Sequence, residues 1–490
     1  MTRFAARCGL DDAAREAACD GVLHTIREQR LERVRIGWCD THGVLRGKTL
    51  MPSAVAQALA SGIGMVGTLM LKDTSDRTAF KVFDPGLPPG LARFAGAPNL
   101  LLLPDPASFC VLPWAPGTGA MLGQPWFADA TPVPIDSRRV LQAALTGLAD
   151  VGYGLRCGLE VEFHVYRILE PRLDPAQAAW PGEPPVLQMI HPGYNLLAES
   201  HADQADDALA IVQHTAQGLG LPLRSLEIEL GPSQVEAVFD PTDAMAAADG
   251  MVRFRNGVKQ ALLRAGYHAS FVCRPPFAQV MASGWHLHQS LVDLSAGGNA
   301  FVRAAAAPGS TPRDAAHVLS PAGEHWLAGL LAHACGAAVL GTPTINGFGR
   351  FRPNALAPQS VVWGRDNRGA MLRVIGDAGD SATRIENRVG EPMANPYLYI
   401  AAQIHSGLDG LKQGLSAPPA TEVPYAPEAL RLPTTLGDGL DALRADTSLA
   451  TAFGADWVDW FVGLKHSELS RHAAANDKAE WDRREYFSRY

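Results

Sequence analysis

The sequence predicts an α+β protein in which a small N-terminal domain precedes a larger domain built on a curved antiparallel sheet. Its 490 residues exceed the length at which a single hydrophobic core usually stops growing, so we expect two domains. Several later segments alternate charged and apolar side chains as strands with one buried face do, and amphipathic helices separate them. We place the domains at 1–130 and 131–490.

The composition is that of an ordinary globular protein, with 47% hydrophobic and 19% charged residues. A formal net charge of −8 with no basic run argues against a nucleic-acid partner. The seven cysteines lack the paired spacing of a zinc site and indicate buried thiols in a reducing compartment. The most apolar segment, Trp326–Gly341, is too short to span a membrane and contains His333, so we predict a buried helix there. We expect a cytoplasmic protein without a membrane partner.

The first domain begins with a helical pattern over residues 11–31 that is rich in Ala, Arg and Glu. A strand, an Asp-Thr-His-Gly turn and a second strand then occupy residues 33–50. A short helix at Ser53–Gly62 and a strand at Leu100–Pro106 follow. The segment Gly117–Pro134, rich in Gly, Pro and Ala, is predicted to be the linker to the larger domain.

Helices separate the strands of the larger domain. Ser137–Gly152 has Asp or Ser near its start and Gly at its end, which are helix boundary signals. The further predicted helices are Ala205–Gly220, Pro241–Ala265, 395–415 and most of 437–490.

The strand at the centre of the predicted site is Gly158–Tyr166. Successive side chains of a strand point to opposite faces, so Glu160, Glu162 and His164 share one face and apolar side chains share the other. Alone, this segment would fit an amphipathic edge strand with its charges in water. The layout recurs, with His286, His288 and Ser290 in Trp285–Ser290, with Arg384, Glu386 and Arg388 in Thr383–Arg388, and with acids at both ends of Glu229–Glu236. We infer a curved sheet that lines a charged cavity.

A cavity with this many acids needs cations. Mg²⁺ and Mn²⁺ take carboxylate oxygens as ligands, and Mn²⁺ accepts imidazole more readily. Six residues could hold two such ions: Glu160, Glu162, Glu229, Glu236, His286 and Glu386. Paired cations are typical of phosphoryl transfer. Arginine suits bidentate contacts with phosphate and carboxylate, and five arginines follow over a short stretch: Arg350, Arg368, Arg373, Arg384 and Arg388. A surface salt-bridge network is the alternative interpretation of these arginines.

These residues resemble the type I glutamine synthetase family. The matching motifs are E-x-E-F at Glu160–Phe163, E-x-G-P-x-Q-x-E at Glu229–Glu236, G-x-H-x-H-x-S at Gly284–Ser290, N-x-x-x-R at Asn346–Arg350, N-R-x-x-x-x-R at Asn367–Arg373, and R-I-E-x-R with A-N-P-Y-L within Arg384–Leu398. They follow one another in the family's order. A single motif would be a weak signal, whereas the ordered set is specific.

The resemblance implies a β-grasp-like small domain and a glutamine-synthetase catalytic domain that uses ATP to convert a carboxylate to an acyl phosphate, which an amine then attacks. It assigns Glu162, Glu229 and Glu236 to one Mg²⁺ or Mn²⁺ site and Glu160, His286 and Glu386 to another. Its further assignments are Ser290, Arg373 and Arg384 to the nucleotide, Arg350 and Arg388 to glutamate, Tyr194 to the amine, and Arg368, Arg373 and Glu229 to catalysis. It also implies a homo-oligomer of six-membered rings stacked as a dodecamer, with sites shared between subunits.

The sequence departs from the family's pattern where ammonium would bind. The family's R-L-V-P-G-Y-E-A-P is RFRPNALAP here, so its Glu is replaced by Leu356, and Met281 and Ala282 replace an Asn-Gly pair. An apolar wall suits an alkyl or aryl amine better than ammonium. We therefore expect a ligase that joins the γ-carboxyl of glutamate to an organic amine, closest to the bacterial γ-glutamyl-amine (γ-glutamylpolyamine-type) synthetases. The alternatives are a glutamine synthetase that uses ammonium and a catalytically silent binding or regulatory relative.

The roles of four further residues stay open. His288 fits a structural role and a ligand role equally, whereas His164 is expected to be structural because the family usually has an aromatic residue there. Asp73 and Asp76 could belong to the family's acidic loop that reaches a neighbouring subunit's site, or they could be ordinary surface residues.

Overall fold

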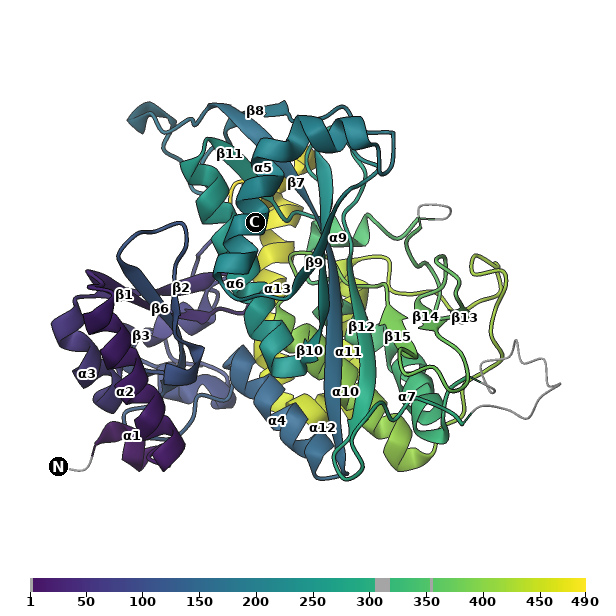
Figure 1. The fold of residues 1–490 in the computed structure, drawn as a ribbon, viewed down its shortest axis with the longest axis horizontal. Coiled ribbons are helices and arrows are strands. Elements are labelled where there is room, and N and C mark those ends of the chain that lie inside the picture. The colour runs from purple at the N-terminus through teal and green to yellow at the C-terminus, as the bar shows by residue number, and fades with distance from the viewer. Residues whose placement is uncertain (1–2, 305–317, 353–355) are drawn as a thin grey trace.

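The computed structural model describes residues 3–304, 318–352 and 356–490, and it contains two sheets with helices packed around them (Figure 1). The six-stranded sheet has the order β2-β1-β6-β4-β3, with β5 paired to β6. The nine-stranded sheet has the order β13-β14-β15-β12-β7-β10-β9, with β8 and β11 also paired to β7. The α+β prediction is confirmed, and the division at residue 130 stays a proposal.

The small sheet contains the predicted hairpin, in which β1 and β2 pair antiparallel. Its turn has Gly43 at φ +78°, a conformation that favours glycine, and the Gly43 N–H donates to the Asp40 carbonyl at 3.0 Å. The strands are β1 (Arg33–Cys39), β2 (Leu45–Leu50), β3 (Ile63–Val66), β4 (Asn99–Pro104), β5 (Cys110–Val111) and β6 (Thr118–Trp126). The first helices are α1 (Phe4–Arg7), α2 (Ala13–Glu28) and α3 (Pro52–Ser61).

The prediction of a linker at Gly117–Pro134 is wrong, because half of this segment is β6. This strand lies between β1, to which it is parallel, and β4, to which it is antiparallel. Its glycines serve close packing: a Cβ at Gly119 would stand 2.7 Å from the Phe109 ring, and one at Gly123 would stand 2.9 Å from Leu102. The glycines that suggested a loop are therefore needed in this buried strand, because a larger side chain would collide with its neighbours.

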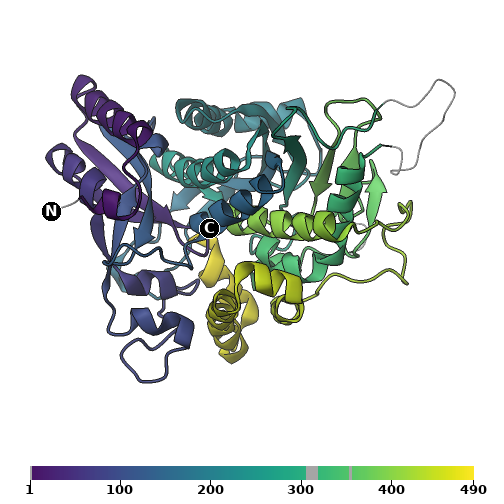
Figure 2. The ribbon, with the colours of Figure 1, turned by 90° about the horizontal axis from the view of Figure 1, so that it is seen from below.

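The large sheet is centred on β7, which pairs with β10, β12, β8 and β11 (Figure 2). All its pairings are antiparallel except that of β13 with β14. The strands are β7 (Tyr153–Glu170), β8 (Val186–Met189), β9 (Leu223–Ile228), β10 (Gln234–Asp243), β11 (Tyr267–Ser270), β12 (Trp285–Asp293), β13 (Trp363–Arg365), β14 (Leu372–Ile375) and β15 (Arg384–Asn387). The predicted strands of the site are thus neighbours in one sheet.

The apolar face of β7 packs against helices. Val161 and Phe163 are fully buried, and the Phe163 ring meets Phe254 of α6 edge to face at 5.9 Å between centroids. The helices of this part are α4 (Ser137–Ala149), α5 (Glu199–Gly218), α6 (Ala244–Arg264), α7 (Pro321–Ala332), α8 (Ala334–Gly341), α9 (Ile345–Phe348), α10 (Pro396–Gln413), α11 (Leu436–Ala445), α12 (Thr447–Phe453), α13 (Ala455–Ala474) and α14 (Lys478–Asp482). Burial of the apolar face leaves the charged face of β7 for the site.

The predicted buried helix Trp326–Gly341 is two helices, α7 and α8, which meet at His333. His333 places Nδ1 2.8 Å from Asp446 and Nε2 2.9 Å from Asp409, so its ring joins this corner to α10 and to the start of α12. Among the described residues, no helix is long and apolar enough to cross a membrane.

Candidate active site

Cross-strand neighbours on one face of the large sheet form the centre of the site. Residues directly opposite each other in an antiparallel pair have adjacent side chains. The opposed pairs are Glu162 and Glu236 across β7 and β10, Glu160 and His286 across β7 and β12, His288 and Glu386 across β12 and β15, and Glu386 and Arg373 across β15 and β14. The register therefore gathers side chains from five strands.

The first ligand group comprises Glu162, Glu229 and Glu236, which offer carboxylate oxygens within 4.8 Å of one another. Glu162 Oε2 accepts hydrogen bonds from the Gly284 N–H at 2.8 Å and from Gln234 Nε2 at 3.2 Å. Burial, together with neighbouring carboxylates, raises the pKa of Glu236, of Glu162 and of Glu229. Three carboxylates in so small a space favour a cation between them.

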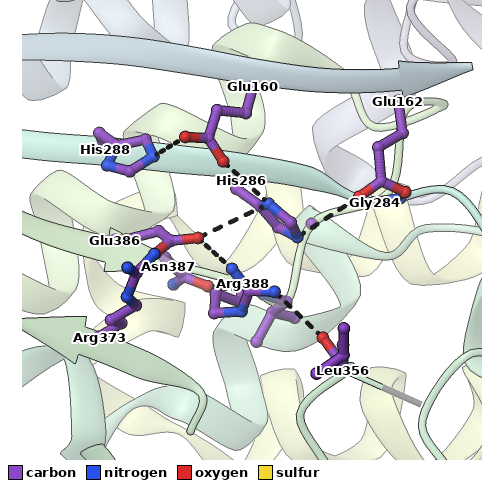
Figure 3. A network of polar contacts seen from close by, with 12 residues as sticks. Glu160, Glu162, Gly284, His286, His288, Leu356, Arg373, Glu386, Asn387 and Arg388 are labelled. Carbon is purple, nitrogen blue, oxygen red and sulfur yellow. Dashed lines mark hydrogen bonds and ion pairs between the residues drawn. The ribbon is translucent and has the colours of Figure 1, made fainter. Parts of the chain in front are cut away.

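The second ligand group surrounds His286 (Figure 3). Its Nδ1 lies 3.2 Å from Glu160 Oε2 and 3.6 Å from Glu386 Oε1. Burial and then Arg388 lower the pKa of His286 to about 4, so the ring is neutral at pH 7 and can donate a lone pair. Compact sets of potential ligands here are Glu160 with Glu236 and His286, and Glu160 with His288 and Glu386. The structure therefore adds His288 and Glu236 as potential ligands beside the predicted set of Glu160, His286 and Glu386.

Glu386 orients two arginines from a fully buried position. Its Oε2 accepts from Arg373 Nη1 at 3.0 Å, and its Oε1 accepts from Arg388 Nη1. Burial alone would raise the pKa of Glu386, but His286 and Arg388 outweigh burial and hold that pKa below its usual value. Arg350 donates through Nη1 to the carbonyl of Arg388 at 2.9 Å. Four of the site's ionic groups are thereby held in one network.

A cavity of about 600 Å³ opens at the His288 end of this network. Ser290, Arg384, Glu160 and His288 line it. Arg384 Nε donates to His288 Nδ1 at 3.1 Å, and His288 Nε2 lies 2.9 Å from Glu160 Oε1. His288 therefore connects the cavity to the ligand groups, and the predicted nucleotide residues Ser290 and Arg384 lie in one pocket.

Apolar side chains occupy the opposite end. Leu356 is 61% exposed, and its carbonyl accepts from Arg388 Nη2 at 3.1 Å. The Tyr425 hydroxyl donates to the next carbonyl, that of Ala357, at 3.4 Å. The preceding residues 353–355 of the predicted segment lie outside the described residues. Tyr194 is 53% exposed, and its N–H donates to the Leu230 carbonyl beside Glu229.

Arg368 lies two residues after Asp366, which accepts a hydrogen bond from Arg373 of the cluster. It is exposed on the turn between β13 and β14. His164 is buried, with Nδ1 3.3 Å from Ser283 Oγ, as a structural residue would be. Asp73 is not a surface residue: it is fully buried, and Arg471 Nε donates to it at 3.0 Å. The part of its loop in a neighbouring subunit's site stays a prediction. Asp76 pairs with Arg46 at 2.7 Å and is the partly exposed acid of that loop.

Two residues of the site escaped prediction. Gln234 holds Glu162 and also donates to Ser283 Oγ at 3.1 Å, and its only sequence signal is its place in the E-x-G-P-x-Q-x-E motif. Asp366 accepts from Arg373 Nε at 2.9 Å. Five non-glycine residues in the surrounding loops have φ between +48° and +59°: Tyr194, Leu197, Ser233, Leu356 and Asp366. Such conformations are costly and concentrate at functional sites.

Comparison with known proteins places this geometry among described enzymes. Residues 134–486 match the family described as glutamine synthetase, catalytic domain. The chain is 38% identical over 494 residues to the γ-glutamylanilide synthase of an Acinetobacter species, with 97% of each chain covered. It is 28% identical over 451 residues to the glutamate–isopropylamine ligase of a Pseudomonas species, covering 91% of this chain and 93% of that one. A solved structure of GmaS with ADP has a TM-score of 0.74 and 29% identity, covering 94% of this chain and 98% of that one.

Proposed function

The chain belongs to the glutamine synthetase family, and we propose that it is an ATP-dependent ligase that joins the γ-carboxyl of glutamate to an organic amine. The reaction passes through γ-glutamyl phosphate, which the amine nitrogen attacks with loss of phosphate. The observation that carries the proposal is the pair of ligand groups beside arginines that Glu386 orients. Carboxylates alone would repel the phosphates of a nucleotide, whereas carboxylates that have bound divalent cations attract them.

Divalent metal fits the residues present. The donors are carboxylate oxygens with a neutral imidazole, which is the chemistry that Mg²⁺ and Mn²⁺ accept. We assign one ion to Glu162, Glu229 and Glu236, and a second to Glu160, His286 and Glu386. When bound, such ions neutralise phosphate oxygens and orient phosphoryl transfer.

The protein's own groups bind and orient the substrates. ATP occupies the cavity with Ser290 and Arg384, and Arg373 reaches its γ-phosphate from the cluster of ionic groups. Arg350 and Arg388 hold glutamate, and their contacts with main-chain carbonyls fix their guanidinium planes in advance. Arg368 is proposed to meet the phosphate from its exposed turn, and Glu229 to act beside the attacking amine.

The amine subsite in this proposal uses Leu356 and Tyr194. An alkylammonium ion has a pKa near that of lysine, about 10.4, and must lose a proton before it can attack. The segment Arg350–Pro358 contains no carboxylate to accept that proton. An arylamine is uncharged at neutral pH and needs no such base. The anilide named for the relative with 38% identity supports an aromatic amine.

The remaining parts of the proposal concern assembly and location. By the family resemblance we propose hexameric rings stacked as a dodecamer, with each site completed by a neighbouring subunit. A cytoplasmic location is supported by the cysteines, all seven of which are free. The small-molecule partners are glutamate, ATP and the amine.

The test is ADP release by the purified full chain with glutamate, ATP and Mg²⁺ or Mn²⁺, in the presence of aniline, isopropylamine, ethanolamine or ammonium. We expect turnover with at least one organic amine and little with ammonium. A preference for ammonium would make the chain a glutamine synthetase. No turnover with any nitrogen donor, despite nucleotide binding, would favour the silent relative. Activity with aniline should change little from pH 7 to 9, whereas activity with an alkylamine should rise roughly tenfold per pH unit.

A further inference from the structure

A second cavity lies where the small sheet meets α6, away from the strands of the active site. It has a volume of about 160 Å³, and its lining residues come from β1, β2 and β6 on one side and from α6 on the other. Arg35 Nη1 of β1 donates across the junction to Gln260 Oε1 of α6 at 2.7 Å. Trp114 Nε1 donates to the same oxygen at 3.1 Å. The small sheet is thus joined to α6 by hydrogen bonds to the uncharged side chain of Gln260, at the edge of the cavity.

The charged lining of this cavity is entirely cationic. Arg35, Arg46, Lys48 and Arg253 line it, and none of its lining residues, all of them described, is Asp or Glu. Arg46 is neutralised by Asp40 at 2.6 Å and Asp76 at 2.7 Å. The other three have only neutral partners in the contacts that are seen: Gln260 for Arg35, and main-chain carbonyls for Lys48 and Arg253. Lys48 lies opposite Ile36 and therefore on the other face of the small sheet from Arg35, where it reaches the Gly64 carbonyl. Arg35 and Arg253 are thus two cationic charges at the hollow without a counter-charge.

The electrostatic environment of Arg35 agrees with this geometry. Burial lowers the pKa of Arg35, and the two charges that act on it, Arg264 and Arg33, lower it further because both are cations. On α6, Arg253, Asn256 and Gln260 are spaced to share one helical face, so this face offers hydrogen-bond donors toward the cationic strands. Two positive surfaces that meet without an acid attract an anion.

The rest of the lining is apolar. Leu112, Trp114, Met121, Leu122 and Leu219 contribute to the wall. A cavity of about 150 Å³ with apolar walls is large enough for benzene. The space therefore suits a small organic body with its charge directed at Arg35 and Arg253, rather than a bare inorganic ion, which would leave the apolar wall in contact with water.

We propose that this cavity binds a small carboxylate with an aromatic or branched apolar body, and that the bound carboxylate ties the β1–β2 hairpin to α6. Arginine pairs with carboxylate through strong, directed hydrogen bonds. The ligand would neutralise the facing cations and fasten the small sheet to the large one. The site is separate from the proposed glutamate subsite, which uses Arg350 and Arg388.

The test measures binding of benzoate to the assembled full chain by calorimetric titration. Benzamide is the matched neutral probe, inorganic phosphate is the probe without an apolar body, and saturating glutamate blocks the active-site arginines. We expect one benzoate per chain in the presence of glutamate, with little binding of benzamide or phosphate. Arg35→Gln should weaken benzoate roughly 10- to 100-fold, the worth of a charged hydrogen bond.

Two further variants keep the test decisive. Arg253→Gln removes the second cation that lacks an acidic partner, and it should also weaken benzoate. Arg444→Gln removes a surface arginine that pairs with Asp459, and it should bind benzoate as the wild type does. Equal affinity in all three variants, displacement by glutamate, equal binding of benzamide, or binding of phosphate alone would each overturn the proposal. None of these results bears on amine ligation, which the ADP assay tests separately.

Discussion

Replacing Glu236 with Gln removes one charge from the three-carboxylate group while keeping the size of the side chain. Glu236 is 7% exposed, and its pKa is raised by burial and then by Glu162, Glu160 and Glu229. Without metal, the group therefore destabilises the fold, whereas with metal the same charges become ligands. We expect Glu236→Gln to stabilise the metal-free protein and to abolish its response to Mg²⁺ and Mn²⁺.

The spacing of the group sets the magnitude. Two ionised carboxylates within 4.8 Å of each other repel by at least about 3.5 kcal/mol at an effective dielectric constant of about 20. Protonation relieves this repulsion, and for a glutamate it costs about 1.36 kcal/mol per pH unit above a pKa of about 4.3, or roughly 3.7 kcal/mol at pH 7. The cost of protonation is the upper limit, so the stabilisation of the metal-free variant is bounded at about 3.7 kcal/mol.

The dependence on pH gives the sign of the effect. A carboxyl whose folded pKa is raised costs nothing below its unfolded pKa, and its cost grows as pH rises toward the folded pKa. The advantage of the variant in EDTA should therefore fall to about 1 kcal/mol at pH 5. Calorimetric Tm values at pH 5 and 7, with EDTA or with metal, measure both effects. Metal at 100 times its Kd should stabilise only the wild type, by about 2.7 kcal/mol.

Glu227→Gln is the matched control, because Glu227 lies opposite Glu236 on β9 but is absent from the ligand groups. It should keep the full response to metal. The reasoning about the three carboxylates is refuted if Glu236→Gln lowers the metal-free Tm at pH 7, or if it still gains Tm on adding metal.

Four other results are expected. Glu386→Ala should abolish metal-dependent ADP release while the chain stays assembled, and full turnover by the wild type in EDTA would contradict the assignment of metal. Arg350→Ala should chiefly raise the KM for glutamate and Arg368→Ala should chiefly lower kcat, so identical effects on both constants would remove that distinction. Leu356→Glu should shift preference from organic amines toward ammonium, within the 10- to 200-fold that about 1–3 kcal/mol allows, and an unchanged preference in amine competition would show that the side chain only fills space. Burial lowers the pKa of His333, but the hydrogen bonds that its ring donates to Asp446 and Asp409 outweigh burial and raise that pKa above its usual value of 6.5. Its stabilisation should therefore be lost as pH rises through this raised pKa, and His333→Gln should remove that part of the fall in Tm, a result that an unchanged pH profile would contradict.

The strands of the site were predictable because alternation is a local property. The pattern in β7 indicated which side chains point to the cavity, and the buried apolar face confirms it. Pairing partners are a property of the whole sheet. The opposition of Glu162 to Glu236 and of His288 to Glu386 follows from a register that joins segments far apart in the chain.

The failures of prediction have a common physical origin in contacts between distant segments. The glycines of β6 looked like loop residues because the side chains of Phe109 and Leu102, which exclude a Cβ, come from other elements. Asp73 looked exposed because its partner Arg471 lies almost 400 positions later in the sequence. Neither kind of contact can be recognised from the composition of the local segment.

The charges of the site connect its metal, phosphate and amine chemistry. The two ligand groups and Glu386 supply five carboxylates, and Arg350, Arg373, Arg384 and Arg388 supply four guanidinium groups, which leaves one net negative charge when the histidines are neutral. Two divalent ions reverse this to a net charge of +3. That field attracts a polyphosphate, whose own negative charge offsets it once bound. Selection of an amine that arrives without a charge is therefore expected from the amine subsite itself, where Leu356 stands in place of a carboxylate.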